Sequence, residues 1–168
     1  MVQFLGSIII QYSGIQYTTN LNRIDLEENE HSRYFLEEGD ILFIRVNGNP
    51  DYVGRSAVFE GYSEAVYHND HLIRIQINSE KYLPKFLVYC FNSTWGKQII
   101  RSQVKTSAGQ HTISQGGIEE LEWYLPDIQL QEKFVLIFDK IQILKNRLIN
   151  HKDNDLFQSL SQQFFNPT

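Results

Sequence analysis

Residues 127–150, DIQLQEKFVLIFDKIQILKNRLIN, decide how this chain is organised. Large apolar side chains recur there at alternating spacings of four and three residues, the heptad repeat of a helix that packs against another helix. These six positions, called the seam below, are Leu130, Phe134, Ile137, Ile141, Leu144 and Leu148. Pro126 and Asp127 supply a helix start signal, and Lys145 and Arg147 place positive charge towards the other end, where the helix dipole favours it. The repeat predicts a long helix with a partner.

Two interpretations of this helix stay open at the level of sequence. It can be an ordinary core helix of a small domain, because periodicity alone does not distinguish the two. Its position after about 125 residues of strand-like sequence favours a projecting arm, roughly 33 Å long over about 22 residues. Leu136 and Ile143 form a second apolar stripe, which indicates more than one neighbour. Beyond His151 the charged HKDND interrupts the heptad, and Leu156, Leu160 and Phe164 predict a separate final helix.

Composition places the chain among folded, soluble proteins. Of its 168 residues, 42% are hydrophobic and 13% aromatic, too many for a disordered segment. We expect one globular domain at residues 1–126 and a helical appendage at 127–168. No apolar run approaches the roughly 18 residues of a membrane span, and no signal peptide is recognisable, so we expect a cytoplasmic protein without membrane contact. Cys90 is the single cysteine and is interpreted as a small core residue.

Charge is distributed unevenly along the chain. The net charge of −5 argues against wholesale attraction to nucleic acid. However, residues 25–40 contain seven acids and one base, whereas residues 81–118 contain five bases and no acid. The bases of this second segment are Lys81, Lys85, Lys97, Arg101 and Lys105. A basic segment inside an acidic protein fits either a contact with a polyanion or an ordinary solvated surface.

The segment before the long helix is predicted to be of the α+β class. Alternating apolar residues predict a hairpin from Ile41–Val46 and Val53–Phe59, joined by the turn NGNPD. Further strands are expected at 64–67, 72–77 and 121–125, and one or two in the N-terminal FLGSIIIQYSGIQYTTN. Two helices are expected at 85–91, opened by Pro84, and from a Ser93 cap to about Val104. Together these elements predict a compact mixed β-sheet domain with short helices.

Motifs for catalysis are weak. His68, Asp70 and His71 suggest a metal hydrolase, but two histidines in a predicted turn are more often exposed to solvent. Neither a phosphate-binding loop G-x-x-x-x-G-K-[ST] nor a G-x-G-x-x-G turn occurs. We therefore expect no catalytic residue and no metal site.

Side chains that recognise DNA bases are better represented. Arginine pairs with guanine, and asparagine or glutamine pairs with adenine, in the major groove. The candidates for base recognition are Arg45, Asn47, Asn49, Arg55, Ser107, Gln110, His111 and Thr112. The first four flank the hairpin and the last four line a later loop, so we place two clusters on opposite sides of one small fold. The candidates for phosphate contacts are Lys97, Arg101 and Lys105. Each residue alone also fits plain turn or surface chemistry.

Several of these segments, in this order, resemble one family. The segments are 36–45 (LEEGDILFIR), 53–55 (VGR), 84–87 (PKFL), 107–113 (SAGQHTI), 125–132 (LPDIQLQE) and the tail at 156–160 and 164–166. From about residue 35 to the end, the chain is similar to the target recognition domain of type I restriction-modification specificity subunits. A typical member has two such domains, each followed by a helix, whereas this chain has room for one. We therefore expect a half-subunit or a fragment.

The resemblance implies a non-catalytic protein that reads one half of a split DNA sequence. Its helix would act as a spacer and would dock the methyltransferase (modification) subunit. S-adenosylmethionine would bind on that partner, with no cofactor here, and a restriction subunit would join through the complex. A single domain would pair through the seam, as a homodimer or with another specificity subunit. The alternative is a protein-interaction adaptor that dimerises through the helix without reading DNA.

Overall fold

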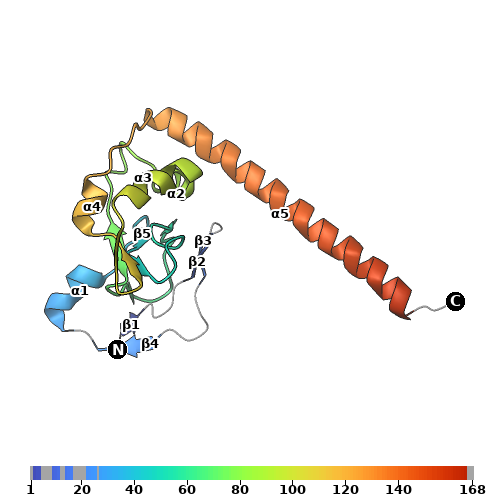
Figure 1. The fold of residues 1–168 in the computed structure, drawn as a ribbon, viewed down its shortest axis with the longest axis horizontal. Coiled ribbons are helices and arrows are strands. Elements are labelled where there is room, and N and C mark those ends of the chain that lie inside the picture. Colours follow the sequence, from blue (N-terminus) through green and yellow to red (C-terminus); the bar gives the residue numbers. More distant parts are fainter. Residues whose placement is uncertain (1, 5–8, 12–13, 17–21, 26, 166–168) are drawn as a thin grey trace. The chain divides into compact units, whose positions relative to one another are not determined.

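The chain divides into two compact units in the computed structural model, which describes residues 2–4, 9–11, 14–16, 22–25 and 27–165 (Figure 1). The N-terminal unit is Met1–Ile128 and the C-terminal unit is Gln129–Thr168. The N-terminal unit contains short strands and short helices, and the C-terminal unit consists of helix α5. The predicted α+β class with a long C-terminal helix is confirmed.

Most elements of the N-terminal unit are short. Its strands are β1 (Val2–Phe4), β2 (Ile9–Gln11), β3 (Gly14–Gln16), β4 (Asn22–Ile24), β5 (Ile41–Ile44), β6 (Val46–Asn47), β7 (Ser56–Val58), β8 (Val66–Tyr67), β9 (Leu72–Ile75), β10 (Lys105–Ser107) and β11 (Gln110–Thr112). The helices are α1 (Glu28–Tyr34), α2 (Pro84–Asn92), α3 (Thr94–Ser102), α4 (Gln115–Glu119) and α5 (Ile128–Phe165). Among the described residues the strand orders are β4-β1-β8, β10-β11-β6, β7-β5-β9 and β2-β3.

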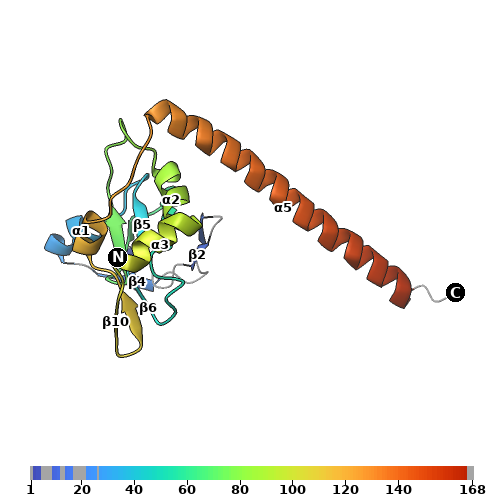
Figure 2. The same ribbon diagram turned by 45° about the horizontal axis from the view of Figure 1, so that its top comes forward.

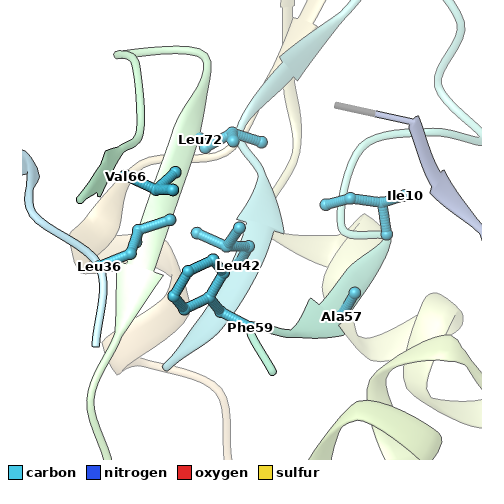
Figure 3. Close-up of a cluster of buried hydrophobic side chains, with 7 residues drawn as sticks. All are labelled: Ile10, Leu36, Leu42, Ala57, Phe59, Val66 and Leu72. Atoms are coloured by element: carbon cyan, nitrogen blue, oxygen red, sulfur yellow. The ribbon is translucent and has the colours of Figure 1, made fainter. Parts of the chain in front are cut away.

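Strand β5 is the centre of the core because both of its faces are buried. It pairs antiparallel with β7, in the register Ile41↔Val58, and with β9 on its other side. The predicted hairpin between β5 and β7 is therefore confirmed. Leu42 points into an apolar cluster built from several elements (Figure 3). The members of this cluster are Ile10, Leu36, Leu42, Ala57, Phe59, Val66 and Leu72.

The opposite face of β5 packs against α2 and α3 through aromatic rings. Phe43 lies edge-on to Phe91 of α2, with ring centroids 5.8 Å apart. Phe91 contacts Trp123 at 5.0 Å, and Trp123 contacts Trp95 of α3 at 5.2 Å. Edge-to-face pairs at these separations are favourable beyond the area they bury. This row of rings fixes both helices, and the segment around Trp123, against the core sheet.

Helices α2 and α3 begin as the sequence predicts. Pro84 opens α2 in the first turn, and the Ser93 hydroxyl accepts a hydrogen bond from the amide of Gly96 at the start of α3. Gly96 allows the two helices to meet, because a Cβ at this position would lie 1.9 Å from the carbonyl oxygen of Cys90. Cys90 is half-buried, and burial raises the pKa of its thiol, so the reactive thiolate is disfavoured.

Two predictions about the second half of the chain are wrong. Residues 121–125 form no strand, although Leu121, Trp123 and Leu125 alternate; Trp123 is held by ring packing instead of strand pairing. Helix α4 precedes this segment, and its start is capped by Ser114, whose hydroxyl accepts the amide of Gly117. The predicted break at HKDND is also absent. Helix α5 runs through it for 38 residues, about 57 Å at 1.5 Å per residue, because local charge alone does not stop a helix.

The histidines of the predicted metal alternative lie in unlike environments. His68 is buried and its Nδ1 donates to the carbonyl of Asn69 at 2.9 Å, so it is not exposed to solvent as expected. His71 is 70% exposed and its Nε2 lies 4.0 Å from Asp70. Within the described residues, no three His, Cys, Asp or Glu side chains gather as a metal site requires. The structure offers no support for a metal hydrolase.

Gly54 should be indispensable to the contact between the core sheet and α3. Its φ is +86°, and a Cβ there would lie 2.6 Å from Ile100 Cγ2. We expect Gly54→Ala to lower the free energy of unfolding by roughly 2–4 kcal/mol, from left-handed strain and overpacking. Urea denaturation measures this loss. Gly48→Ala is the matched control, because its only close atom is Gln110 Nε2 at 3.9 Å. Equal losses for both variants would contradict this account.

Burial of His68 should make folding stability depend on pH. Its pKa lies below the usual 6.5, chiefly because burial disfavours the charged ring. The unfolded chain therefore takes up this proton first, so stability is complete above pH 6.5 and falls as the pH drops through the folded pKa. We expect His68→Gln to flatten the fall in unfolding free energy between pH 7 and 5. His71→Gln, at an exposed position, should leave the slope unchanged, and the opposite ranking would refute the assignment.

Candidate nucleic-acid interface

The strand that crosses the core continues into a second sheet. At Arg45 it passes from the core sheet to the sheet β10-β11-β6: the Arg45 amide donates to the carbonyl of His71 at 2.9 Å, and its carbonyl accepts from the amide of Ile113 at 3.0 Å. Ile113, directly after β11, is fully buried. Strand β6 then pairs antiparallel with β11, in the register His111↔Asn47. The second sheet is therefore anchored in the core at its base.

Strands β10 and β11 form a tight hairpin. Ser107 pairs with Gln110, and the two-residue turn Ala108-Gly109 joins them with φ of +48° and +79°. Two positive φ values are typical of a type I′ turn, whose twist matches that of the strands. The segment 106–114, predicted as a loop, is in large part this hairpin. Figure 2 shows the hairpin and the loop after β6 at the same end of the N-terminal unit.

The two clusters of candidate base-reading residues therefore meet, rather than lying on opposite sides as predicted. Asn47 lies beside His111 in the sheet, and Gln110 Nε2 lies 3.9 Å from where a Cβ of Gly48 would be. Paired residues share a face of a sheet and neighbours in sequence alternate. Ser107 and Gln110 consequently lie on one face, and Asn47 and His111 on the other. The sheet presents candidate side chains on both faces.

The asparagines of the first cluster shape its loop. The Asn47 side-chain oxygen accepts the amide of Asn49 at 2.8 Å, and the Asn49 oxygen accepts the amide of Asp51 at 2.9 Å. A carbonyl oxygen has two lone pairs, so each retains one for another donor. These hydrogen bonds give both residues a structural role in the turn. Pairing with adenine would have to be added to that role.

The arginines of this cluster are held at exposed or half-exposed positions. Arg45 is exposed, and its Nη1 donates to the carbonyl of Asp70 at 3.4 Å. Arg55 is half-buried: its Nε donates to the carbonyl of Asp51 at 3.1 Å, and its guanidinium lies 3.9 Å from the ring centroid of Tyr52. A stacked guanidinium keeps free N–H groups at its edge while its plane is fixed.

The hairpin carries the second cluster. Ser107 and Gln110 are exposed, whereas His111 and Thr112 are half-buried. His111 Nδ1 lies 2.9 Å from the hydroxyl of Thr106 across the ribbon, which holds the imidazole in place. Ser107 and Gln110 are thus the most accessible of the candidates on the hairpin.

The three candidates for phosphate contacts lie on or just after α3 and differ in their surroundings. Lys97 is half-buried, whereas Arg101 and Lys105 are exposed. Arg101 forms an ion pair with Asp51, which the sequence analysis did not single out because 50 residues separate the partners. Tyr52 and Thr106, the partners of Arg55 and His111, were also missed. No signal in the sequence links any of these pairs.

The seam of the C-terminal unit is exposed to solvent. Its six residues, Leu130, Phe134, Ile137, Ile141, Leu144 and Leu148, are between 42% and 65% exposed. Leu136, Ile143 and Ile149 are exposed as well. So much accessible apolar surface on one helix is typical of an interface. Over the residues described, no helix is long and apolar enough to cross a membrane.

Comparisons with known proteins identify the family. The model of the type I restriction modification DNA specificity domain matches residues 3–158. The chain is 38% identical, over 69% of its length, to the type I restriction enzyme StySPI specificity subunit of Salmonella potsdam. It is 29% identical, over 67% of its length, to the EcoKI specificity subunit of Escherichia coli K12. The matches cover 25% and 24% of those relatives, so this chain spans about a quarter of their length. The chain belongs to the family of type I restriction-modification DNA specificity domains.

Proposed function

We propose that this chain reads one half of a bipartite DNA target for a type I restriction-modification complex. The observation that carries the proposal is the pairing of β11 with β6, which joins both clusters of candidate base-reading residues in one sheet. A two-stranded ribbon fits the major groove of DNA, where amide and guanidinium groups distinguish bases. The family membership supports the same role, because its members are DNA specificity domains.

The proposed division of roles follows from exposure. Gln110 and Ser107 lie at the tip of the hairpin and would contact base edges, with Arg45, Arg55 and His111 behind them. Asn47, Asn49 and Thr112 would contribute from the sheet and its loop. Lys97, Arg101 and Lys105 would contact phosphates, which set register and add affinity without sequence preference.

Helix α5 would supply the contacts with protein partners. Its exposed seam would pair with a second copy of this chain or with another specificity subunit, and its additional apolar residues would dock a methyltransferase subunit. The chain itself would be non-catalytic. Adenine methylation, with S-adenosylmethionine as methyl donor, would take place on the methyltransferase subunit, and cleavage on a restriction subunit. The length of α5 would help to set the spacing between the two half-sites.

Two substitutions on the hairpin separate affinity from sequence choice. Lys105→Ala should weaken binding to every duplex alike and reduce the slope of log K against log salt by about 0.9, because one phosphate contact is lost. Gln110→Ala should leave that slope unchanged but relax the choice at one base pair. The measurements are salt titrations on random duplexes and methylation mapping with the reconstituted complex. Each variant is the control for the other, and a uniform loss for Gln110→Ala would argue against base recognition.

Self-association and docking through α5 can be tested at the seam. Ile137→Asp with Leu144→Asp should abolish pairing and weaken binding to the methyltransferase subunit, because two carboxylates would be buried without partners. Light scattering and a titration with that subunit measure the two effects. Asn146→Asp adds the same charge on the opposite side of the helix and should change neither. Unchanged mass and binding would rule out the seam as an interface.

A protein-interaction adaptor is the second candidate, and the exposed seam favours it equally. The two functions differ in what random duplex DNA does. An adaptor would keep its pairing through α5 but would show no DNA affinity that depends on Lys105.

A further inference from the structure

Asp51 stands out because it is an acid inside the candidate interface. Between Ile41 and Phe59 it is the only acidic residue, and residues 81–118 contain none. A carboxylate repels the phosphates of DNA, so it opposes the binding that the neighbouring bases would favour. A position so close to the candidate DNA contacts needs a physical explanation.

The carboxylate of Asp51 engages the guanidinium of Arg101, one of the three candidates for phosphate contacts. Both side chains remain more than half exposed, at 61% for Asp51 and 55% for Arg101. The pair therefore lies at the surface, where DNA would approach. Arg101 can bind a phosphate only by exchanging one anionic partner for another.

The turn around Asp51 holds this carboxylate in place. The Asp51 amide donates to the side chain of Asn49 at 2.9 Å, and the Asp51 carbonyl accepts from Arg55 Nε at 3.1 Å. The amide of Tyr52 donates to the carbonyl of Asn49 at 3.1 Å. Asp51 is thus presented from an ordered turn, and its backbone is fixed independently of Arg101.

The fold does not depend on the ion pair. Helix α3 is held by the Ser93 cap and by buried Ile100, which packs against Gly54. Exposed ion pairs contribute little to stability. The main physical effect of Asp51 is therefore on the charge and the availability of Arg101.

We propose that Asp51 occupies Arg101 in place of a DNA phosphate and so lowers the affinity of the protein for DNA of any sequence. Weaker non-specific binding increases discrimination, because specificity is the difference between two affinities. Asp51 is in this sense a specificity-determining residue that contacts no base. The inference rests on the proposed DNA-binding function.

Neutralising Asp51 in the full chain tests this role. Asp51→Asn keeps the size of the side chain and releases Arg101 from a full negative charge. Binding to a random-sequence duplex is measured by fluorescence anisotropy between about 50 and 200 mM salt. We expect the slope of log K against log salt to steepen by about 0.9, which corresponds to about eightfold tighter binding at 0.1 M if the lines meet near 1 M.

Three further variants separate this mechanism from a general change in charge. Asp51→Glu restores the carboxylate and should behave like the wild type. Asp51→Asn combined with Arg101→Gln should lose the steeper slope, because no arginine is released. Glu60→Gln removes one negative charge at the opposite end of β7 and should leave the slope unchanged. Thermal melts of all variants check that folding is intact.

The outcomes distinguish the two proposals. If Lys105→Ala weakens binding but Asp51→Asn leaves the slope unchanged, or steepens it equally without Arg101, the role of Asp51 is refuted and DNA recognition stands. If the wild type shows no affinity for duplex DNA at the lowest salt, or Lys105→Ala changes nothing, the proposed function fails and the role of Asp51 fails with it.

Discussion

One stretch of backbone, from Ile41 to Asn47, serves two sheets, and the candidate interface depends on it. Its first part is the central strand of the core, buried on both faces, and its last part pairs with the hairpin. Arg45 joins the two, with its amide bonded towards β9 and its carbonyl bonded to Ile113. Because the second sheet continues directly from the most deeply buried strand, its side chains are held by the core rather than by a loop. Recognition sites built on such rigid elements keep their geometry better than sites on loops.

Local signals in the sequence predicted much of this structure. The Ser93 cap, Pro84 at the start of α2, the β5–β7 hairpin and the seam each rest on spacings of a few residues, within reach of propensity and periodicity. Pairings between distant segments were not accessible in this way. Asn47 meets His111, and Asp51 meets Arg101, through contacts that no local pattern encodes, so the clusters were placed apart. Residues 121–125 failed for another reason: alternating Leu and Trp side chains resemble a strand, but here the ring of Trp123 packs against Phe91.

The charge of the whole protein and the charge of its candidate interface point in different directions. The net charge is −5, yet the acids concentrate in residues 25–40 and are absent from residues 81–118. An acidic protein can still attract a polyanion locally, because exposed charges act over roughly a Debye length of about 8–10 Å. The net value therefore reports on solubility and general adhesion more than on a particular surface. Lys105 and Arg101 lie where that distinction matters.

The two-residue turn of the β10–β11 hairpin has an evolutionary implication. Its tip residues, Ser107 and Gln110, are exposed and support no part of the core. Exchanging them therefore costs the fold little, whereas the buried anchor at Ile113 tolerates no comparable change. Lineages can accordingly diversify the tip while the scaffold stays constant, and a new preference can arise without first restoring lost stability. Such a separation between a permissive rim and an intolerant base favours rapid divergence under selection.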